Sequence, residues 1–145
     1  MAALSPAMRI TTIARLFRTR FDRRAREIGL TRAQWRTIYW VKLRPGATQH
    51  EIATLLEVGD VTAGRSIDRL AEAGWVERRS DPRDRRVYRI YLTENATPVL
   101  NRLSALGDDE ERIAFAGFSQ EEMAQLEPML IRIADNLSGQ ECGAQ

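Results

Sequence analysis

The chain has 145 residues, of which 43% are hydrophobic, and a formal net charge of +2. No apolar run approaches the roughly 20 residues needed to span a membrane. The N-terminal stretch lacks the unbroken apolar segment of a signal peptide, so we expect a cytoplasmic protein. Residues 1–89 hold 19 basic and 10 acidic side chains, whereas residues 90–145 hold 3 and 10. This asymmetry indicates a polyanionic partner for the first part and a solvated or self-associating surface for the last.

The sequence contains few residues that could serve as catalytic groups or metal ligands. His50 and Glu51 could begin a zinc-binding His-Glu-x-x-His motif, but Thr54 stands where the second histidine should be. One histidine and one cysteine form neither a metal cluster nor a nucleophile–base pair. The acidic runs 108–111 and 121–122 are expected to be solvated helix faces or first-turn acids. We therefore expect no enzyme, no catalytic residue, no metal and no cofactor.

Cys142 is the only cysteine and lies in a polar tail. It cannot form an internal disulfide, which agrees with a reducing compartment. A redox-sensing role is the less favoured alternative, because no neighbouring basic residue would lower the pKa of its thiol.

Apolar residues at spacings of three and four predict a long helix over residues 5–28, ended by Gly29. The opposite face of this helix is rich in arginine. A second helix is predicted to open at Thr31, which has the capping-box spacing with Gln34, and to end before Pro45.

The same capping pattern opens a third helix at Thr48, with Glu51 three residues later. After a turn at Val58 and Gly59, a fourth helix is predicted from about Asp60 to Ala73. Its apolar residues are expected to face inward. The residues expected to face outward are Val61, Thr62, Arg65, Ser66 and Arg69.

Residues 76–79 and 87–92 are rich in β-branched and aromatic side chains and predict two strands. The loop between them packs arginines and two aspartates around Pro82. A helix for the major groove followed by a cationic hairpin suits a DNA duplex. Helical patterns return from Glu94 to about Phe115 and again from Ser119, which has the capping-box spacing with Glu122.

Five segments resemble the MarR family of winged-helix regulators, in particular its SlyA-like branch. They are LTRAQW (30–35), HEIATLLEV (50–58), RSIDRLAEAGWVERR (65–79), DPRDRR (81–86) and LTE (92–94). The resemblance implies a mainly α fold with a small β-hairpin wing, in which a winged helix–turn–helix is flanked by dimerisation helices. The implied parts are an N-terminal dimerisation helix (1–30), a DNA-binding lobe (31–93), and C-terminal dimerisation helices with a tail (94–145).

The implied function is that of a homodimeric, sequence-specific DNA-binding regulator, more often a repressor in this family. A two-fold protein matches a pseudo-palindromic operator. An effector would release the protein by favouring a non-binding arrangement. The alternative from another class is a winged-helix module whose arginine-rich loop binds an acidic protein partner.

The resemblance places the fourth helix in the major groove. Arg65 would either bond guanine with two hydrogen bonds or clamp a phosphate, and Thr62 could donate to phosphate or base. Arg69 would meet the DNA backbone or form a surface ion pair. Two departures from the family pattern are Gly59, where a capping Ser or Thr is common, and Gly64. We expect Gly64 to cost up to about 1 kcal/mol of helix stability relative to alanine. We also expect it to remove a side chain from the DNA-facing rim, which would shift weight to the wing.

In the wing, Arg85 and Arg86 match the family's minor-groove pair, and Arg83 at the tip is a further candidate for phosphate contact. Asp81 and Asp84 are expected to hold arginine side chains and so to preorganise the loop. The alternative is a solvated, charged hairpin without a partner.

Members of the family commonly bind small anionic aromatic ligands or aryl-CoA thioesters in a cleft between the dimer helices and the DNA-binding lobe. Here Trp35, Tyr39 and Trp40 could supply the aromatic wall, and Arg15 and Arg18 could pair with the anionic group. The alternative is that these aromatic residues belong to the core.

Overall fold

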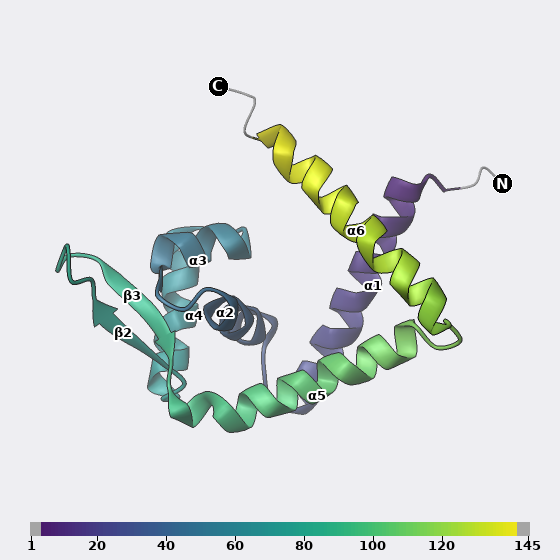
Figure 1. The fold of residues 1–145 in the computed structure, drawn as a ribbon. Coiled ribbons are helices and arrows are strands. Elements are labelled where there is room, and N and C mark those ends of the chain that lie inside the picture. The colour runs from purple at the N-terminus through teal and green to yellow at the C-terminus, as the bar shows by residue number, and fades with distance from the viewer. Residues whose placement is uncertain (1–3, 142–145) are drawn as a thin grey trace. The chain divides into compact units, whose positions relative to one another are not determined.

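The computed structural model describes residues 4–141, so Cys142 lies outside the described residues. This part of the chain contains six α-helices and a small sheet, which confirms the predicted fold class; their arrangement can be followed in Figure 1. The elements are α1 (Pro6–Glu27), α2 (Arg32–Leu43), β1 (Ala47–Thr48), α3 (Gln49–Leu56), α4 (Asp60–Glu72), β2 (Val76–Ser80), β3 (Tyr88–Leu92), the short 3-10 helix η1 (Glu94–Ala96), α5 (Thr97–Ala114) and α6 (Gln120–Glu141).

The chain forms two compact units with the boundary between Glu110 and Glu111, inside α5. The first unit contains the helix–turn–helix, the wing, α1 and most of α5. The second contains the end of α5 and all of α6. The predicted division into dimerisation and DNA-binding segments concerns the assembled protein and stays a prediction.

The helices begin where their capping residues stand. Thr31 and Gln34 exchange hydrogen bonds at the start of α2, and Thr48 and Glu51 do so at the start of α3. Ser119 N donates to Glu122 Oε2 at 2.8 Å, and Glu122 N donates to Ser119 Oγ at 3.2 Å. These reciprocal bonds satisfy backbone donors that the first helical turn leaves unpaired. All three predicted capping boxes are confirmed.

The core of the first unit lies between α2, α3, α4 and the sheet. Side chains that recur at helical spacing on these helices meet the inward side chains of the strands. The largest fully buried ones include Ile38, Val41, Ile52, Ile67, Leu70 and Ile90. Ala25 of α1 and Val99 of α5 extend this core at its edge.

The sheet has the strand order β1-β3-β2, and both pairings are antiparallel. β2 and β3 form the predicted hairpin, with Arg79 opposite Arg89. The two-residue strand β1 was not predicted, because two residues cannot display an alternating pattern. It pairs Ala47 with Ile90, and Gly46 N donates to Ile90 O at 2.9 Å. The end of α2 is thereby attached to the wing.

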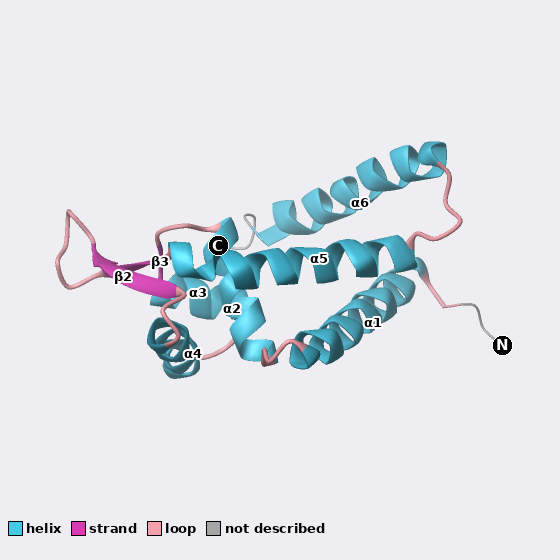
Figure 2. Ribbon diagram, turned by 90° about the horizontal axis from the view of Figure 1, so that it is seen from below, coloured by secondary structure: helices cyan, strands magenta, loops and turns pink. Residues whose placement is uncertain are grey.

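The sequence predicts that the acidic run 108–111 is a solvated helix face, but the structure shows that one of its residues is buried. Glu110 is buried and accepts hydrogen bonds from Arg20 Nε at 2.5 Å and from Arg24 Nη1 at 3.2 Å, while Arg24 Nη2 donates to Asp109 at 2.8 Å. Figure 2 shows α1 running beside α5, which brings these residues together. Hydrogen bonding from Arg20, followed by that from Arg24, lowers the pKa of Glu110 against the effect of burial.

In the second unit, Phe115 and Phe118 pack edge to face with ring centroids 5.8 Å apart, just before α6. No described side chain of α6 is buried. Its exposed apolar residues are Met129, Leu130, Ile131, Ile133 and Leu137. Within residues 4–141, no helix combines the length and apolar character that crossing a membrane requires.

Candidate nucleic-acid interface

The helix–turn–helix consists of α3, a three-residue turn and α4. Glu57 ends α3 in the left-handed conformation, with φ 58° and ψ 44°, and Val58 N donates to Ala53 O at 3.0 Å. Gly59 is the N-cap residue of α4 and supplies no side-chain cap. Ile52 of α3 and Ile67 of α4 are fully buried in the shared core, which fixes the angle of α4 to the rest of the lobe.

Four of the predicted contact residues of α4 do face outward. Val61 is 69% exposed, and the side chains of Thr62, Arg65 and Arg69 are also exposed. Arg65 and Arg69 make no ion pair with any residue that the structure describes. The surface ion pair considered for Arg69 is therefore not formed within the described chain. Both guanidinium groups are available to an external anion.

The prediction that Ser66 faces outward is wrong. Ser66 is only 5% exposed, because it lies three residues after Ala63 and four before Leu70, on the inner stripe of α4. Its Oγ lies 2.8 Å from Thr37 Oγ1 and donates to Ala33 O at 3.3 Å. Ser66 thus joins α4 to α2 through a satisfied hydroxyl and cannot reach DNA from this position.

The prediction that Gly64 lies on the DNA-facing rim of the helix is also wrong, because Gly64 is buried against α3. A Cβ at Gly64 would lie 2.8 Å from Gln49 Nε2. Gln49 Nε2 donates to Asp60 O at 3.1 Å and so connects the first residues of α3 and α4. Gly64 makes room for this connection, and its lack of a side chain removes nothing from the outer face.

The wing loop is braced at both of its aspartates. Asp81 is buried, and its Oδ1 accepts from Arg83 N at 2.7 Å while its Oδ2 accepts from Arg89 Nε. Asp84 Oδ1 accepts from Arg86 N at 3.0 Å. The backbone bond from Arg83, followed by the side-chain bond from Arg89, lowers the pKa of Asp81. Both aspartates were expected to hold arginine side chains, but both hold backbone amides. The only guanidinium that either of them binds in the described chain is that of Arg89, which is not among the predicted site residues.

The wing arginines that we did single out remain exposed. Arg83, Arg85 and Arg86 form no ion pair in the described part of the chain. Their backbone is ordered by the two aspartates while their side chains are available. This arrangement suits a ligand of repeated negative charge, because little further ordering of the loop is needed when it binds.

A groove of about 390 Å³ separates the wing from the first turns of α3 and α4. Arg86 and Arg78 line one side and His50 and Asp60 line the other. His50 Nδ1 lies 3.0 Å from Asp60 Oδ1, and Arg78 Nη2 donates to Asp68 at 2.5 Å. Sequence reasoning considered His50 only as a zinc ligand and did not consider Arg78. Nothing local to either residue indicates that α3, α4 and the wing meet here.

The residues proposed for an effector pocket occupy different environments. Trp35 is half-buried, packs on Phe21 with ring centroids 4.6 Å apart, and donates from Nε1 to Asp22 at 2.9 Å. These contacts hold α2 against α1. Tyr39 is 48% exposed and stacks edge-on against the half-buried Trp40. Arg15 and Arg18 are exposed on α1. A ligand site at these residues stays a prediction.

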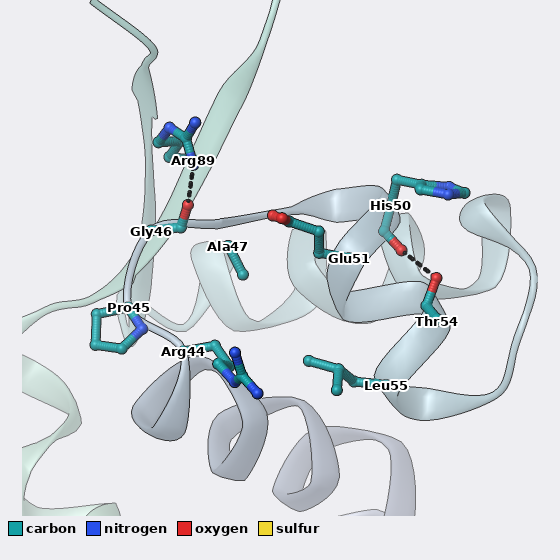
Figure 3. Close-up of a pocket in the computed structure, with 9 residues that line it drawn as sticks. All are labelled: Arg44, Pro45, Gly46, Ala47, His50, Glu51, Thr54, Leu55 and Arg89. Carbon is teal, nitrogen blue, oxygen red and sulfur yellow. Dashed lines mark hydrogen bonds between the residues drawn. The ribbon is translucent and has the colours of Figure 1, made fainter. Parts of the chain in front are cut away.

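A cavity of about 430 Å³ opens at the junction of α2, α3 and the wing, as Figure 3 shows. None of the proposed effector residues lines it. Its wall combines cationic, acidic and apolar side chains: Arg44, Pro45, Gly46, Ala47, His50, Glu51, Thr54, Leu55 and Arg89. The capping hydrogen bonds from Thr48 lower the pKa of Glu51, which faces the same space.

Comparison with known proteins agrees with this architecture. A model of the MarR family matches residues 28–87. The chain is 32% identical to the transcriptional regulator SlyA, over 94% of this chain and 96% of that one, with a TM-score of 0.75. It is 25% identical to a MarR protein, over 99% and 98% of the two chains, with a TM-score of 0.83.

A putative MarR family regulator from Listeria monocytogenes, solved in complex with a 26mer DNA, is 18% identical, over 97% and 92% of the two chains, with a TM-score of 0.77. At this identity the likeness speaks for the fold alone. The match to SlyA covers nearly the whole of both chains, and the family model covers the helix–turn–helix and most of the wing. The chain therefore belongs to the MarR family of winged-helix transcriptional regulators.

Proposed function

We propose that this protein is a sequence-specific regulator that binds double-stranded DNA as a homodimer and represses transcription by occupying a pseudo-palindromic operator. The observation that carries the proposal is the presence of two sets of exposed arginines without ion-pair partners in the described chain. One set is Arg65 and Arg69 on α4, and the other is Arg83, Arg85 and Arg86 on the braced wing. A related protein has been solved on a 26mer DNA.

The two sets of arginines suit different parts of a duplex. Arg65 lies near the start of α4, where a recognition helix presents side chains to base edges in the major groove. A guanidinium there can make two hydrogen bonds to guanine. Arg85 and Arg86 extend from a narrow hairpin, which fits the adjacent minor groove. Base reading is assigned to the helix, and much of the backbone affinity to the wing.

The homodimer is supported by apolar surface that the described chain leaves uncovered. Met8, Ile13 and Leu16 on α1 are 55%, 51% and 49% exposed. On α6, Leu137 is 67% exposed, and four further apolar side chains are exposed along the same helix. Helices with exposed apolar stripes of this kind require a partner in water. A two-fold dimer would present two copies of α4 to two half-sites.

We further propose that a small anionic aromatic compound or an aryl-CoA thioester releases the protein from DNA. Ligand response is typical of the family. Such a ligand would have to bind the non-DNA-binding arrangement more tightly than the binding one, because equal affinity shifts no population. Salicylate and benzoyl-CoA are suitable probes. A rise in melting temperature together with release of labelled operator would support this effector class. The absence of both changes would count against it.

The rival function is recognition of an acidic protein by the same arginines. Selecting fragments of the organism's own genome with the purified protein, followed by competition with random duplex, separates the two. The proposal requires an enriched inverted repeat bound at least about a thousandfold more tightly than random DNA, with affinity that falls steeply as salt rises. Equal affinity for all duplexes would overturn sequence-specific regulation.

A further inference from the structure

We propose that Arg89 is a positioning residue for DNA binding: it fixes the wing to the junction between α2 and α3 and so aims the wing arginines without touching DNA itself. This inference rests on the proposed function. It concerns a residue of β3 that lies outside the arginine-rich loop.

One guanidinium joins three segments, one of which is distant in sequence. Arg89 Nε donates to Asp81 Oδ2, at the start of the wing loop, and Arg89 Nη1 donates to Gly46 O at 2.9 Å, between α2 and β1. Figure 3 shows the second of these bonds, with Arg89 reaching from β3 to the Gly46 carbonyl. The carboxylate of this pair is sheltered, since the Asp81 side chain is only 7% exposed, while that of Arg89 is 39% exposed.

The position of Asp81 determines the path of the loop. Asp81 N donates to Val87 O at 2.8 Å, which closes the hairpin, and Asp81 Oδ1 accepts from Arg83 N at 2.7 Å. Because Oδ2 is bound to Arg89, the plane of the carboxylate is fixed. The direction in which the loop leaves β2 therefore depends on Arg89, four positions beyond Arg85 in the sequence.

The other end of the connection is equally constrained. Gly46 has a φ of +81°, and a Cβ there would lie 2.7 Å from Tyr91 Oη. The peptide that carries this carbonyl is held by Ala47 N, which donates to Arg44 O at 3.1 Å, so the carbonyl cannot rotate freely away from Arg89. A fixed carbonyl and a fixed carboxylate require two donors in a set geometry. The planar fork of arginine provides them, whereas the single ammonium of lysine does not.

Arg89 differs in this respect from the wing arginines. Both of its bonded nitrogens are committed to groups within the protein, and its side chain forms part of the cavity wall at the α2–α3 junction. Of its three guanidinium nitrogens, only Nη2 makes no hydrogen bond to the residues that the structure describes. Its removal should loosen the loop and leave the number of phosphate contacts unchanged.

The test compares Arg89→Gln and Arg89→Lys with Arg79→Gln. Arg79 lies directly opposite Arg89 in the β2–β3 ladder, so its substitution removes the same charge from the same rung. Arg79 pairs with Glu77 and lies over the Tyr91 ring, without reaching the loop. Binding to the selected operator is measured by fluorescence anisotropy at several salt concentrations, and hydrogen exchange is measured on the free proteins.

We expect Arg89→Gln to weaken operator binding by about tenfold, equivalent to about 1.4 kcal/mol, with an unchanged salt slope. Arg89→Lys should restore part of this loss, and Arg79→Gln should have a smaller effect. The amides of Arg83 and Val87 should exchange faster in Arg89→Gln than in Arg79→Gln. Equal affinity and equal exchange in the two glutamine variants would overturn the inference. A salt slope reduced by about 1.8 would also overturn it, because that change marks one lost phosphate contact in each protomer of the proposed dimer.

Failure of the proposed function has a separate signature. If the wild-type protein binds no duplex, the DNA-binding proposal fails, while the exchange rates still decide whether Arg89 orders the loop. If Arg89→Gln does not fold, Asp81→Asn provides the second variant. It keeps an acceptor for Arg83 N but loses the charge, and should give the same fast exchange around the loop. Normal protection in Asp81→Asn would contradict the role given to the pair.

Discussion

Arginines on α1 and arginines on the wing look alike in sequence but have opposite environments. Arg20 and Arg24 on α1 are bound to the buried carboxylate of Glu110 on α5. Arg85 and Arg86 on the wing are exposed and form no ion pair within residues 4–141. The first pair contributes to holding the fold, and the second is available to a partner. Whether an arginine-rich segment is structural or binds a polyanion thus depends on where the acidic side chains lie in space.

The largest expected effect comes from removing the exposed arginines of the wing. The double substitution Arg85→Ala/Arg86→Ala should weaken operator binding by about a hundredfold and reduce the slope of log affinity against log salt by about 3.6, because the proposed dimer loses two phosphate contacts in each of its two wings. The melting temperature should change little, since neither side chain forms an internal ion pair. Anisotropy titrations at four salt concentrations measure both quantities. An unchanged slope would show that these arginines do not meet the backbone.

The sequence predicted the helices and their caps well, because helical spacing and capping boxes are local patterns. Ser66 was wrongly expected on the outer face of the helix, and Gly64 on its DNA-facing rim. Their angle on α4, relative to its buried apolar positions, would have placed them inside. Glu110 and Arg89 could not be assigned from the sequence at all. Their partners lie up to 90 residues away, and no local pattern indicates which of several acids or arginines makes the contact.

Neighbouring residues on α4 provide the next test. Arg65→Ala should leave stability nearly unchanged but weaken discrimination at one base pair by about 1–3 kcal/mol. Ser66→Ala should do the reverse, with unchanged base preference and a loss of about 1 kcal/mol of unfolding free energy, because Thr37 and Ala33 O lose a buried partner. Selection of operator variants and urea unfolding measure the two effects. If Ser66→Ala changed base preference instead, the inward placement of its side chain would be contradicted.

On the structural side of the comparison, Glu110→Gln should lower the free energy of unfolding by about 1 to 2 kcal/mol. Loss of a fully buried charge pair costs about 3–5 kcal/mol, but Arg20 and Arg24 are partly exposed and can turn to water. Glu111→Gln is a matched control on the adjacent exposed position. Operator affinity at saturating folded protein should not change in either variant. A loss of operator affinity in Glu110→Gln, but not in Glu111→Gln, would contradict the assignment of the α1 arginines to the fold and of the wing arginines to DNA binding.

The smallest expected effect is a loss of folding stability at acid pH, which involves one carboxylate bound to α1 and one in the wing. The pKa values of Glu110 and Asp81 are both lowered in the folded protein, by Arg20 on α1 and by Arg83 N in the wing. A carboxyl with a lowered folded pKa contributes stability that is fully present above its ordinary pKa and is lost as pH falls through the folded value. The ordinary values here are 4.5 and 3.8, so stability from these groups should be constant from pH 5 to 8 and decline below about pH 4. Urea unfolding at pH 5 and pH 3.5 should show a larger decline for the wild type than for Glu110→Gln, which has already lost one of the two groups. Equal declines would mean that the ionised Glu110 contributes nothing to stability, and that the α1 arginines are no more committed to the fold than those of the wing.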